Sequence, residues 1–227
     1  MTDGRRDIRA VLFDLDGTLA DTAPDLAYAL NETLRRFGEP PLPYERVRPH
    51  VSHGASALIR LGFPYEPGSG PFEERRQVLL NVYQANLCRE TRPFTGMPAV
   101  LEALERSGMP WGVVTNKPSW LTDPLMELMG LAARAGCVVS GDTCTSKKPD
   151  PEPILYACER LGVPATHSVY VGDAERDIEA GRRAGTATLA ATFGYLREGE
   201  DPVAWQADAL IDHPLALLAW LGLDGHG

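Results

Sequence analysis

The stretch of sequence that decides the fold is RAVLFDLDGT, residues 9–18. Its apolar part, Arg9–Phe13, is a short run typical of a strand buried on both faces of a parallel sheet. Two carboxylates, Asp14 and Asp16, follow at once, and the chain turns at Gly17. Side chains two positions apart in an extended segment project to the same face. We therefore expect both carboxylates to point together from the end of this strand.

Short apolar runs and stretches of helical periodicity alternate along most of the remaining chain. The predicted strands are Arg9–Phe13, Trp111–Thr115, Cys137–Ser140, Ser168–Val171, Thr186–Thr192 and Ala209–Ile211. The predicted helices among them are Met97–Ser107, Trp120–Met129, Pro151–Leu161, Ile178–Ala184 and Leu215–Leu221. This alternation predicts an α/β fold with a Rossmann-like, doubly wound parallel sheet.

One long segment, residues 22–92, interrupts the alternation and contains no convincing strand. Its helical periodicity covers Asp25–Phe37, Gly54–Leu61 and Phe72–Cys88. We expect this block to be an all-helical cap, inserted into a catalytic core made of residues 1–21 and 93–227. Such a cap would lie over the carboxyl end of the first strand, the edge at which ligands bind in open α/β sheets.

Composition and charge exclude several functional classes. Hydrophobic residues make up 44% of the 227 residues and charged residues 23%, as in ordinary globular proteins. No apolar run approaches the roughly 20 residues that a membrane span needs, and the N-terminal stretch lacks a signal-peptide pattern. The formal net charge of −9 offers no general basic face for nucleic acid. We expect a cytoplasmic protein without membrane or nucleic-acid partners, either a monomer or a homodimer.

The cysteines give no sign of a metal site. Cys88, Cys137, Cys144 and Cys158 are scattered and form no C-x-x-C pair. Zinc sites need closely spaced ligand pairs, so free thiols are expected instead.

A second acidic motif also follows a predicted strand. GDAERD, residues 172–177, comes directly after Ser168–Val171. Because parallel strands end at the same edge of a sheet, Asp173 is expected close to Asp14, and the resulting oxygen cluster would suit Mg²⁺. The alternative is that Asp173 caps the next helix, a common role for aspartate. Capping alone would not explain why carboxylates end two separate core strands.

Two weaker motifs offer groups for a phosphate. VVTNK, residues 113–117, presents the Thr115 hydroxyl, the Asn116 amide and backbone N–H groups at a helix start. KKPDP, residues 147–151, holds Lys148 before a proline-led helix, where its charge could neutralise a phosphoryl group. By itself the first motif is more typical of a turn, and the second of a solvated loop.

Taken in this order, the four motifs resemble the haloacid dehalogenase superfamily over nearly the whole chain. The resemblance implies a Rossmann-like core with a helical cap and a Mg²⁺-dependent phosphomonoesterase acting on a small phosphorylated metabolite. The run GDAERDIEAGRRAGT, residues 172–186, is similar to the phosphoglycolate phosphatase group. PWGVVTNKP, residues 110–118, and VSHGA, residues 51–55, are similar to a bacterial subgroup that dephosphorylates N-acetylmuramic acid 6-phosphate.

Carried over by position, the resemblance assigns the catalytic roles. It makes Asp14 the nucleophile that forms an aspartyl-phosphate, and Asp16 the general acid and base. Thr115 and Lys148 become residues that bind the phosphate and stabilise the intermediate.

The resemblance also implies the metal and substrate contacts. The implied Mg²⁺ ligands are Asp14, the backbone carbonyl of Asp16 and Asp173, with Asp177 supporting them. The N–H groups of Leu15 and Asn116 become phosphate contacts. His53 stands where the subgroup commonly has glycine, so it is either a substrate-pocket residue or a polar turn residue on the cap surface.

Several related activities remain as alternatives or are disfavoured. A dehalogenase lacks the second carboxylate of the first motif, whereas Asp16 is present, and a phosphonatase carries a cap lysine, whereas residues 22–92 contain none. A sugar phosphomutase on the same fold stays possible, as does a non-catalytic phosphate-binding module. For a phosphatase the candidate substrates are 2-phosphoglycolate and N-acetylmuramic acid 6-phosphate.

Overall fold

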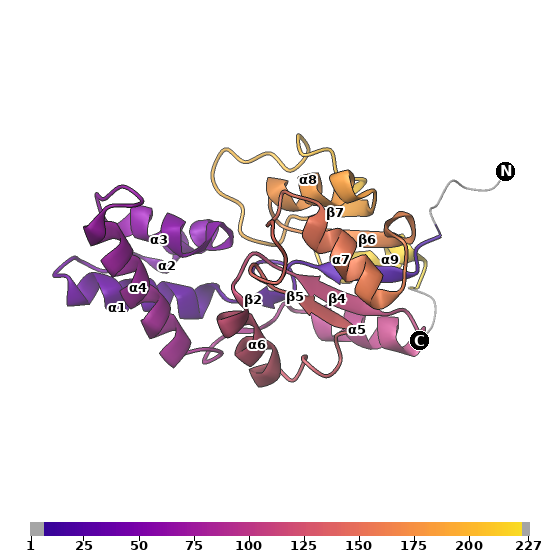
Figure 1. Cartoon of the computed structure of the whole chain (residues 1–227), viewed down its shortest axis with the longest axis horizontal. Helices are drawn as coiled ribbons and strands as arrows, with labels where there is room; N and C mark the ends of the chain where they lie inside the picture. Colours follow the sequence, from indigo (N-terminus) through magenta and orange to yellow (C-terminus); the bar gives the residue numbers. More distant parts are fainter. Residues whose placement is uncertain (1–6, 224–227) are drawn as a thin grey trace.

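A six-stranded parallel sheet forms the centre of the molecule, as a computed structural model describing residues 7–223 shows (Figure 1). Its order is β5-β4-β1-β6-β7-β8. The strands are β1 (Ala10–Phe13), β4 (Trp111–Val114), β5 (Cys137–Val139), β6 (Ser168–Gly172), β7 (Ala187–Ala191) and β8 (Ala209–Ile211). The predicted α/β fold and its six strands are confirmed. The chain reverses its direction of winding at β1, and open α/β sheets bind ligands at such a point.

Helices cover both faces of this sheet. They are α5 (Met97–Arg106), α6 (Ser119–Leu128), α7 (Glu152–Leu161), α8 (Glu175–Ala184) and α9 (Ala216–Leu221), with a short 3-10 turn, η2 (Ala165–His167). Successive residues of β1 point to opposite faces. Val11 and Phe13 pack with α5, α6 and α9, whereas Leu12 packs with α7 and α8. Because both faces are buried, the strand is apolar throughout, and Asp14 is the first polar residue at its end.

A helical cap is inserted after β1 and lies to one side of the sheet (Figure 1). Its elements are α1 (Ala23–Arg36), α2 (Tyr44–Val47), the 3-10 helix η1 (Arg48–His53), α3 (Gly54–Gly62) and α4 (Gly70–Ala85). The sequence patterns predicted α1, α3 and α4 but not α2 and η1, which are too short to show a period. The cap has a hydrophobic core of its own, joined by Leu121 and Tyr195 from the other part of the molecule.

The domain limits at residues 22 and 92 stay a prediction, and residues 1–6 and 224–227 of the predicted core lie outside the described residues. The four cysteines form no disulfide among residues 7–223, and the expected absence of a zinc site stays a prediction. Within residues 7–223, no helix has both the length and the apolar character needed to cross a membrane.

The chain passes from the core into the cap and later returns to the core. These two connections are joined by a small two-stranded sheet that the sequence did not predict. β2 (Ala20–Asp21) and β3 (Arg92–Pro93) pair antiparallel, and two residues are too few to show strand periodicity. Beside them, the buried carboxylate of Asp25 on α1 accepts hydrogen bonds from the N–H groups of Glu90 and Thr91, both at 3.0 Å. It also accepts the Thr91 hydroxyl at 2.7 Å. Asp25 thus holds the segment that leads back to the core, at Glu90 and Thr91, against α1 at the start of the cap.

Replacing this carboxylate should destabilise the protein. In Asp25→Ala the buried donors of Thr91 lose their acceptor, so we expect the free energy of unfolding to fall by about 2–4 kcal/mol in urea denaturation. The matched control is Arg36→Ala, an exposed position on the same helix, which should change it by no more than about 0.5 kcal/mol. Equal small effects for both variants would contradict the role given to Asp25.

Candidate active site

A buried lysine joins the carboxyl ends of the central strands. The Nζ atom of Lys148 lies 2.9 Å from Asp14 Oδ1 and 2.8 Å from Asp177 Oδ1. It also donates to the Val114 carbonyl at 2.9 Å and to the Tyr170 hydroxyl at 2.6 Å. Its side chain is 1% exposed. A charge so far from water needs partners on all sides, and β1, β4, β6 and α8 each supply one.

The loop that carries Lys148 is held by a side chain. The Asn116 amide donates to the Lys148 carbonyl at 2.9 Å and its oxygen accepts the Lys148 N–H at 3.0 Å. The sequence analysis offered this amide as a phosphate contact, whereas in the structure it holds the backbone of Lys148, a contact that was missed. Among residues 7–223, no acceptor pairs with the N–H groups of Leu15 and Asn116, and their predicted contact with phosphate stays a prediction. The Thr115 hydroxyl lines the same cavity.

Three buried carboxylates form a cluster beside this lysine. Asp14, Asp173 and Asp177 each place an oxygen within 4.8 Å of the others. Burial, followed by the charges of Asp14 and Asp177, raises the pKa of Asp173 to about 7. Burial also raises the pKa of Asp14, although Lys148 opposes the shift. Asp173 Oδ1 has no hydrogen-bond partner within the described chain. A hard cation would supply the missing positive charge and prefers such oxygens, so these residues fit Mg²⁺.

The turn after β1 passes very close to this cluster. Gly17 has a φ of +91°, and a Cβ atom there would lie 2.0 Å from Asp173 Oδ2. Any side chain would therefore collide with the carboxylate and strain the backbone. Glycine is required here because two loops approach each other, in addition to making the turn that the sequence indicated.

The carboxylate of Asp16 has partners different from those of Asp14. It accepts hydrogen bonds from Lys117 Nζ at 2.7 Å and from the Thr22 hydroxyl at 2.6 Å. Burial alone would lower the pKa of Lys117, but the Asp16 charge raises it above its ordinary value. The Lys117 ammonium also lies 4.7 Å from the ring centre of Tyr83, a cap residue. The motif VVTNK predicted no role for Lys117, so its contact with Asp16 was missed.

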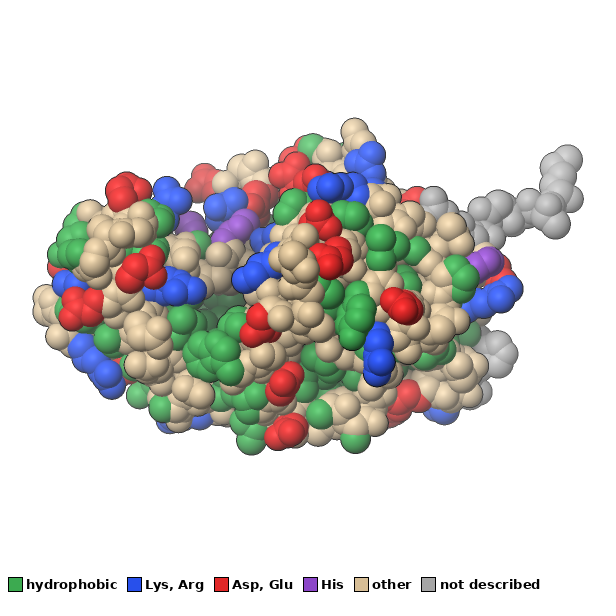
Figure 2. All heavy atoms as spheres, viewed as in Figure 1, with side chains coloured by type: hydrophobic (Ala, Val, Ile, Leu, Met, Phe, Trp, Pro, Cys, Tyr) green, Lys and Arg blue, Asp and Glu red, His purple; other side chains and the backbone are tan. Residues whose placement is uncertain are grey.

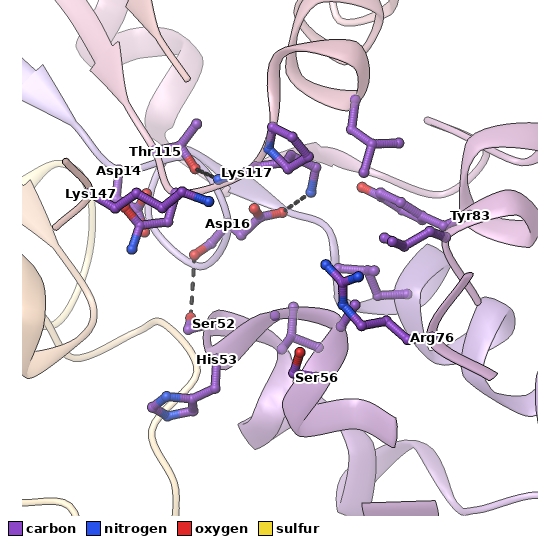
Figure 3. Close-up of a pocket in the computed structure, with 18 of the residues that line it drawn as sticks. Asp14, Asp16, Ser52, His53, Ser56, Arg76, Tyr83, Thr115, Lys117 and Lys147 are labelled. Atoms are coloured by element: carbon purple, nitrogen blue, oxygen red, sulfur yellow. Dashed lines mark hydrogen bonds and ion pairs between the residues drawn. The ribbon is translucent and has the colours of Figure 1, made fainter. Parts of the chain in front are cut away.

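Of the four predicted metal residues, Asp16 stands outside the carboxylate cluster. Its backbone carbonyl, the atom implied by the resemblance, lies 3.3 Å from the Ser52 hydroxyl. The same hydroxyl donates to Asp173 Oδ2 at 2.6 Å. The Asp16 carbonyl is therefore next to the cluster, although its carboxylate turns towards Lys117 (Figure 3).

A cavity of about 590 Å³ separates the cap from these residues. Figure 2 shows the surface hollowed between the two parts, and Figure 3 shows side chains from both entering the space. The polar lining includes Asp14, Asp16, Thr115, Lys117, Lys147 and Arg176 from the core, and Ser52, His53, Ser56, Arg76 and Tyr83 from the cap. The apolar lining includes Leu26, Val51, Leu80, Trp120 and Leu121. The cavity is large enough for a ligand well beyond a few atoms.

The 3-10 helix η1 seats the cap on the core around Asp173. Besides the Ser52 hydroxyl, the Ser52 carbonyl accepts the Arg176 guanidinium at 2.7 Å, and Arg48 donates to the Gly194 carbonyl at 3.1 Å. The Nε2 atom of His53 lies 3.2 Å from a Glu200 carboxylate oxygen. Burial and the neighbouring Arg197 lower the pKa of His53. His53 lines the cavity, and its predicted contact with substrate stays a prediction.

The sequence could have indicated some of the missed residues. A tyrosine inside the apolar run of β6 is a polar group that needs a partner, and Tyr170 finds it in Lys148 and the Val114 carbonyl. Arg176 lies within the acidic motif GDAERD, where a cation among carboxylates was a visible signal. No local pattern marks Ser52, which meets Asp173 from another part of the molecule.

Comparisons with known proteins agree with this geometry. The model of the haloacid dehalogenase-like hydrolase family matches residues 11–191. The chain is 44% identical to an N-acetylmuramic acid 6-phosphate phosphatase of Pseudomonas aeruginosa, over 94% of this chain and 95% of that protein. It is 42% identical to a phosphoglycolate phosphatase of Xanthomonas campestris, over 91% and 93%. The crystal structure of a predicted phosphoglycolate phosphatase from Haemophilus somnus aligns with a TM-score of 0.84 at 28% identity, covering 95% of this chain and 99% of that one.

The raised pKa of Asp173 predicts how stability depends on pH without metal. Between about pH 4 and pH 7 the folded protein keeps a proton on Asp173 that the unfolded chain has released, because the pKa rises from 3.8 to about 7. The contribution of Asp173 to the free energy of unfolding therefore falls as pH rises through this range. Urea denaturation in EDTA should show the stability of Asp173→Asn rising relative to the native protein over the same range.

The control for this prediction is the native protein with added Mg²⁺. A cation that binds only the folded state stabilises it, so at pH 7 Mg²⁺ should stabilise the native protein more than it stabilises Asp173→Asn. Hydrogen bonds lost in the variant would give an offset that is constant with pH. A stability difference that does not change between about pH 4 and pH 7 would contradict the raised pKa.

Proposed function

Because the chain belongs to the haloacid dehalogenase-like hydrolases, we propose that it hydrolyses a phosphomonoester through an aspartyl-phosphate formed on Asp14, with Mg²⁺ as cofactor. Membership confirms the resemblance that the four sequence motifs carried. The observation that carries the mechanism is the contact of 2.9 Å between Lys148 and Asp14 at the end of β1. It supports a carboxylate nucleophile held in one orientation at the floor of the cavity.

The first chemical step is the transfer of the phosphoryl group to the protein. An Asp14 oxygen attacks phosphorus in line with the ester oxygen, so that one P–O bond forms as the other breaks. Asp16 gives its proton to the departing alkoxide, which leaves as an alcohol. Lys148, Thr115 and the N–H groups of Leu15 and Asn116 stabilise the phosphoryl oxygens. Asp14, Asp173 and the Asp16 carbonyl, with Asp177 beside them, would hold Mg²⁺, which when bound would supply positive charge to offset that of the phosphoryl group.

The second step returns Asp14 to its starting state. A water molecule attacks the phosphorus of the aspartyl-phosphate, Asp16 accepts the water proton, and inorganic phosphate leaves. Lys117 and the Thr22 hydroxyl both donate to Asp16 and so fix the orientation of its carboxyl group. Tyr83 of the cap lies against Lys117, so the environment of Asp16 depends on the position of the cap.

The size and lining of the cavity support N-acetylmuramic acid 6-phosphate as the substrate. The relative from Pseudomonas aeruginosa carries that activity in its name. A molecule as small as 2-phosphoglycolate would leave much of the 590 Å³ cavity and its apolar wall without contact. It remains the second candidate because the relative from Xanthomonas campestris is named a phosphoglycolate phosphatase. The cytoplasmic location and the monomeric or homodimeric state stay predictions.

Removing the nucleophile should abolish turnover. We expect Asp14→Asn to lower kcat/KM by at least about 10³-fold, because a neutral amide cannot attack phosphorus as the carboxylate does. Release of inorganic phosphate with Mg²⁺ is measured on N-acetylmuramic acid 6-phosphate, 2-phosphoglycolate and p-nitrophenyl phosphate. Circular dichroism and urea denaturation check that the variant is folded.

Labelled phosphate provides the second readout for this variant. A rapidly denatured reaction of the native protein should retain label on the chain, whereas Asp14→Asn should retain none. Near-native turnover by the variant would exclude the mechanism. Transfer of the phosphate to another hydroxyl of the sugar, without release, would identify a phosphomutase, and an inert but phosphate-binding native protein would identify a binding module.

Removing the acid should matter only for leaving groups that need a proton. In single-turnover experiments, Asp16→Asn should slow release of the sugar alcohol by about 10²- to 10⁴-fold. It should slow release of p-nitrophenolate far less, because this weakly basic leaving group departs without protonation. Equal slowing of both substrates would show that Asp16 acts by positioning and not as an acid.

A further inference from the structure

Cationic side chains line the cavity at two separate places. Near the carboxylates, Lys117 is paired with Asp16 and Arg176 donates to the Ser52 carbonyl. Lys147 lies in the loop next to Lys148, on the Asp14 side of the cavity (Figure 3). Arg76 is different, since it belongs to the cap and lies across the cavity from Asp14 (Figure 3). A phosphate bound at Asp14 would lie near this first group and leave Arg76 free.

The helical spacing of α4 directs Arg76 into the cavity. Arg76, Leu80 and Tyr83 are four and three residues apart, so they lie on one face of the helix. All three line the cavity. The adjacent Arg75 points elsewhere, with its guanidinium 4.1 Å from the ring centre of Phe37. Arg75 therefore packs within the cap, while Arg76 faces the ligand space.

The guanidinium of Arg76 has donors to spare. Its ion pair among the described residues is with Glu73 at 3.5 Å, where the two side chains are 39% and 51% exposed. Such an exposed pair within one helix is weak because water screens it. The planar fork of arginine matches the two oxygens of a carboxylate and can bind both at once. Arg76 is thus available to bind a second anionic group of a ligand.

The wall of the cavity is suited to an uncharged ring. Leu80 and Leu121 line it together with Trp120, which is 39% exposed despite its size. The aromatic face of a tryptophan packs well against the apolar face of a sugar ring. The cavity therefore offers a phosphate site at Asp14, an apolar wall and a separate cation at Arg76.

We propose that Arg76 binds a carboxylate of the substrate at the end remote from the phosphate, and that the enzyme thereby selects phosphorylated sugar acids over neutral sugar phosphates. This inference rests on the proposed function and specifies which class of phosphomonoester the site accepts. N-acetylmuramic acid 6-phosphate has the required chemistry, because its lactyl ether carries a carboxylate on the opposite side of the ring from the phosphate. N-acetylglucosamine 6-phosphate is the same molecule without that ether.

The test compares these two substrates in the native protein and in Arg76→Leu. On N-acetylmuramic acid 6-phosphate, Arg76→Leu should lower kcat/KM by about 10- to 100-fold, mainly through KM, because a charge-assisted contact made before the chemical step is lost. On N-acetylglucosamine 6-phosphate we expect a change of less than about threefold, since that substrate never made the contact. Arg76→Lys should recover part of the loss, because it restores the charge without the planar fork.

Matched controls separate this role from a general effect on the cap. Arg60→Leu removes the same charge from an exposed site on α3 that does not line the cavity, so both substrates should react at native rates. Should Arg76→Leu fold poorly, Arg76→Gln replaces it. In addition, calorimetry of N-acetylmuramic acid 6-phosphate binding to Asp14→Asn, with and without the Arg76 substitution, measures the contact without turnover. A weaker affinity in the double variant is expected.

Each failure has its own signature. Equal losses on both substrates, or unchanged affinity in the double variant, would overturn the carboxylate contact. A loss confined to sugar bisphosphates would show that Arg76 binds a second phosphate instead. If the native protein fails to hydrolyse any phosphomonoester, including p-nitrophenyl phosphate, the proposed function itself is wrong.

Discussion

The buried ammonium of Lys148 is the group on which the arrangement of the site depends. It can exist out of water only because Asp14, Asp177, Tyr170 and the Val114 carbonyl all meet it. Such an ion pair adds little net stability, since removing its charges from water offsets most of their attraction. Instead, the ion pair fixes the positions of Asp14 and Asp177 relative to each other. Four elements of the core must reach the same point, and Asp14, the proposed nucleophile, is then held between a cation and two further carboxylates.

The cap completes the site from outside the sheet. η1 contacts Asp173, Arg176 and the loop after β7, while α4 places Tyr83 against Lys117. These contacts place cap residues beside the carboxylate cluster and beside the lysine that pairs with Asp16. The charge of the side chains that line the cavity differs in sign from the net charge of the whole chain. The whole protein carries a formal charge of −9, yet the cavity is lined by two carboxylates and four lysine or arginine side chains. An anionic substrate is therefore compatible with an acidic protein.

The sequence predicted the sheet and most of the candidate site, but not the contacts among its residues. Apolar runs and helical periods are local signals, so strands and the longer cap helices could be located from them. The two-residue strands β2 and β3 and the short η1 lack a period and were missed. The motifs also indicated Asp14, Asp173 and Lys148, since each adjoins a recognisable strand or helix start. They did not indicate that Asp16 turns away from the carboxylate cluster towards Lys117.

By itself the sequence determined the type of fold and the chemistry of the floor of the cavity, because both follow from residue types at short spacings. Only the tertiary structure decided which groups act together. Lys148 and Asp14 are 134 positions apart, and Ser52 and Asp173 are 121 apart. No periodic pattern connects residues at such separations, and their contact depends on the order of the strands and on where the cap rests. The same reason applies to Arg76, which no motif in the sequence marks and which the packing of α4 places in the lining of the cavity.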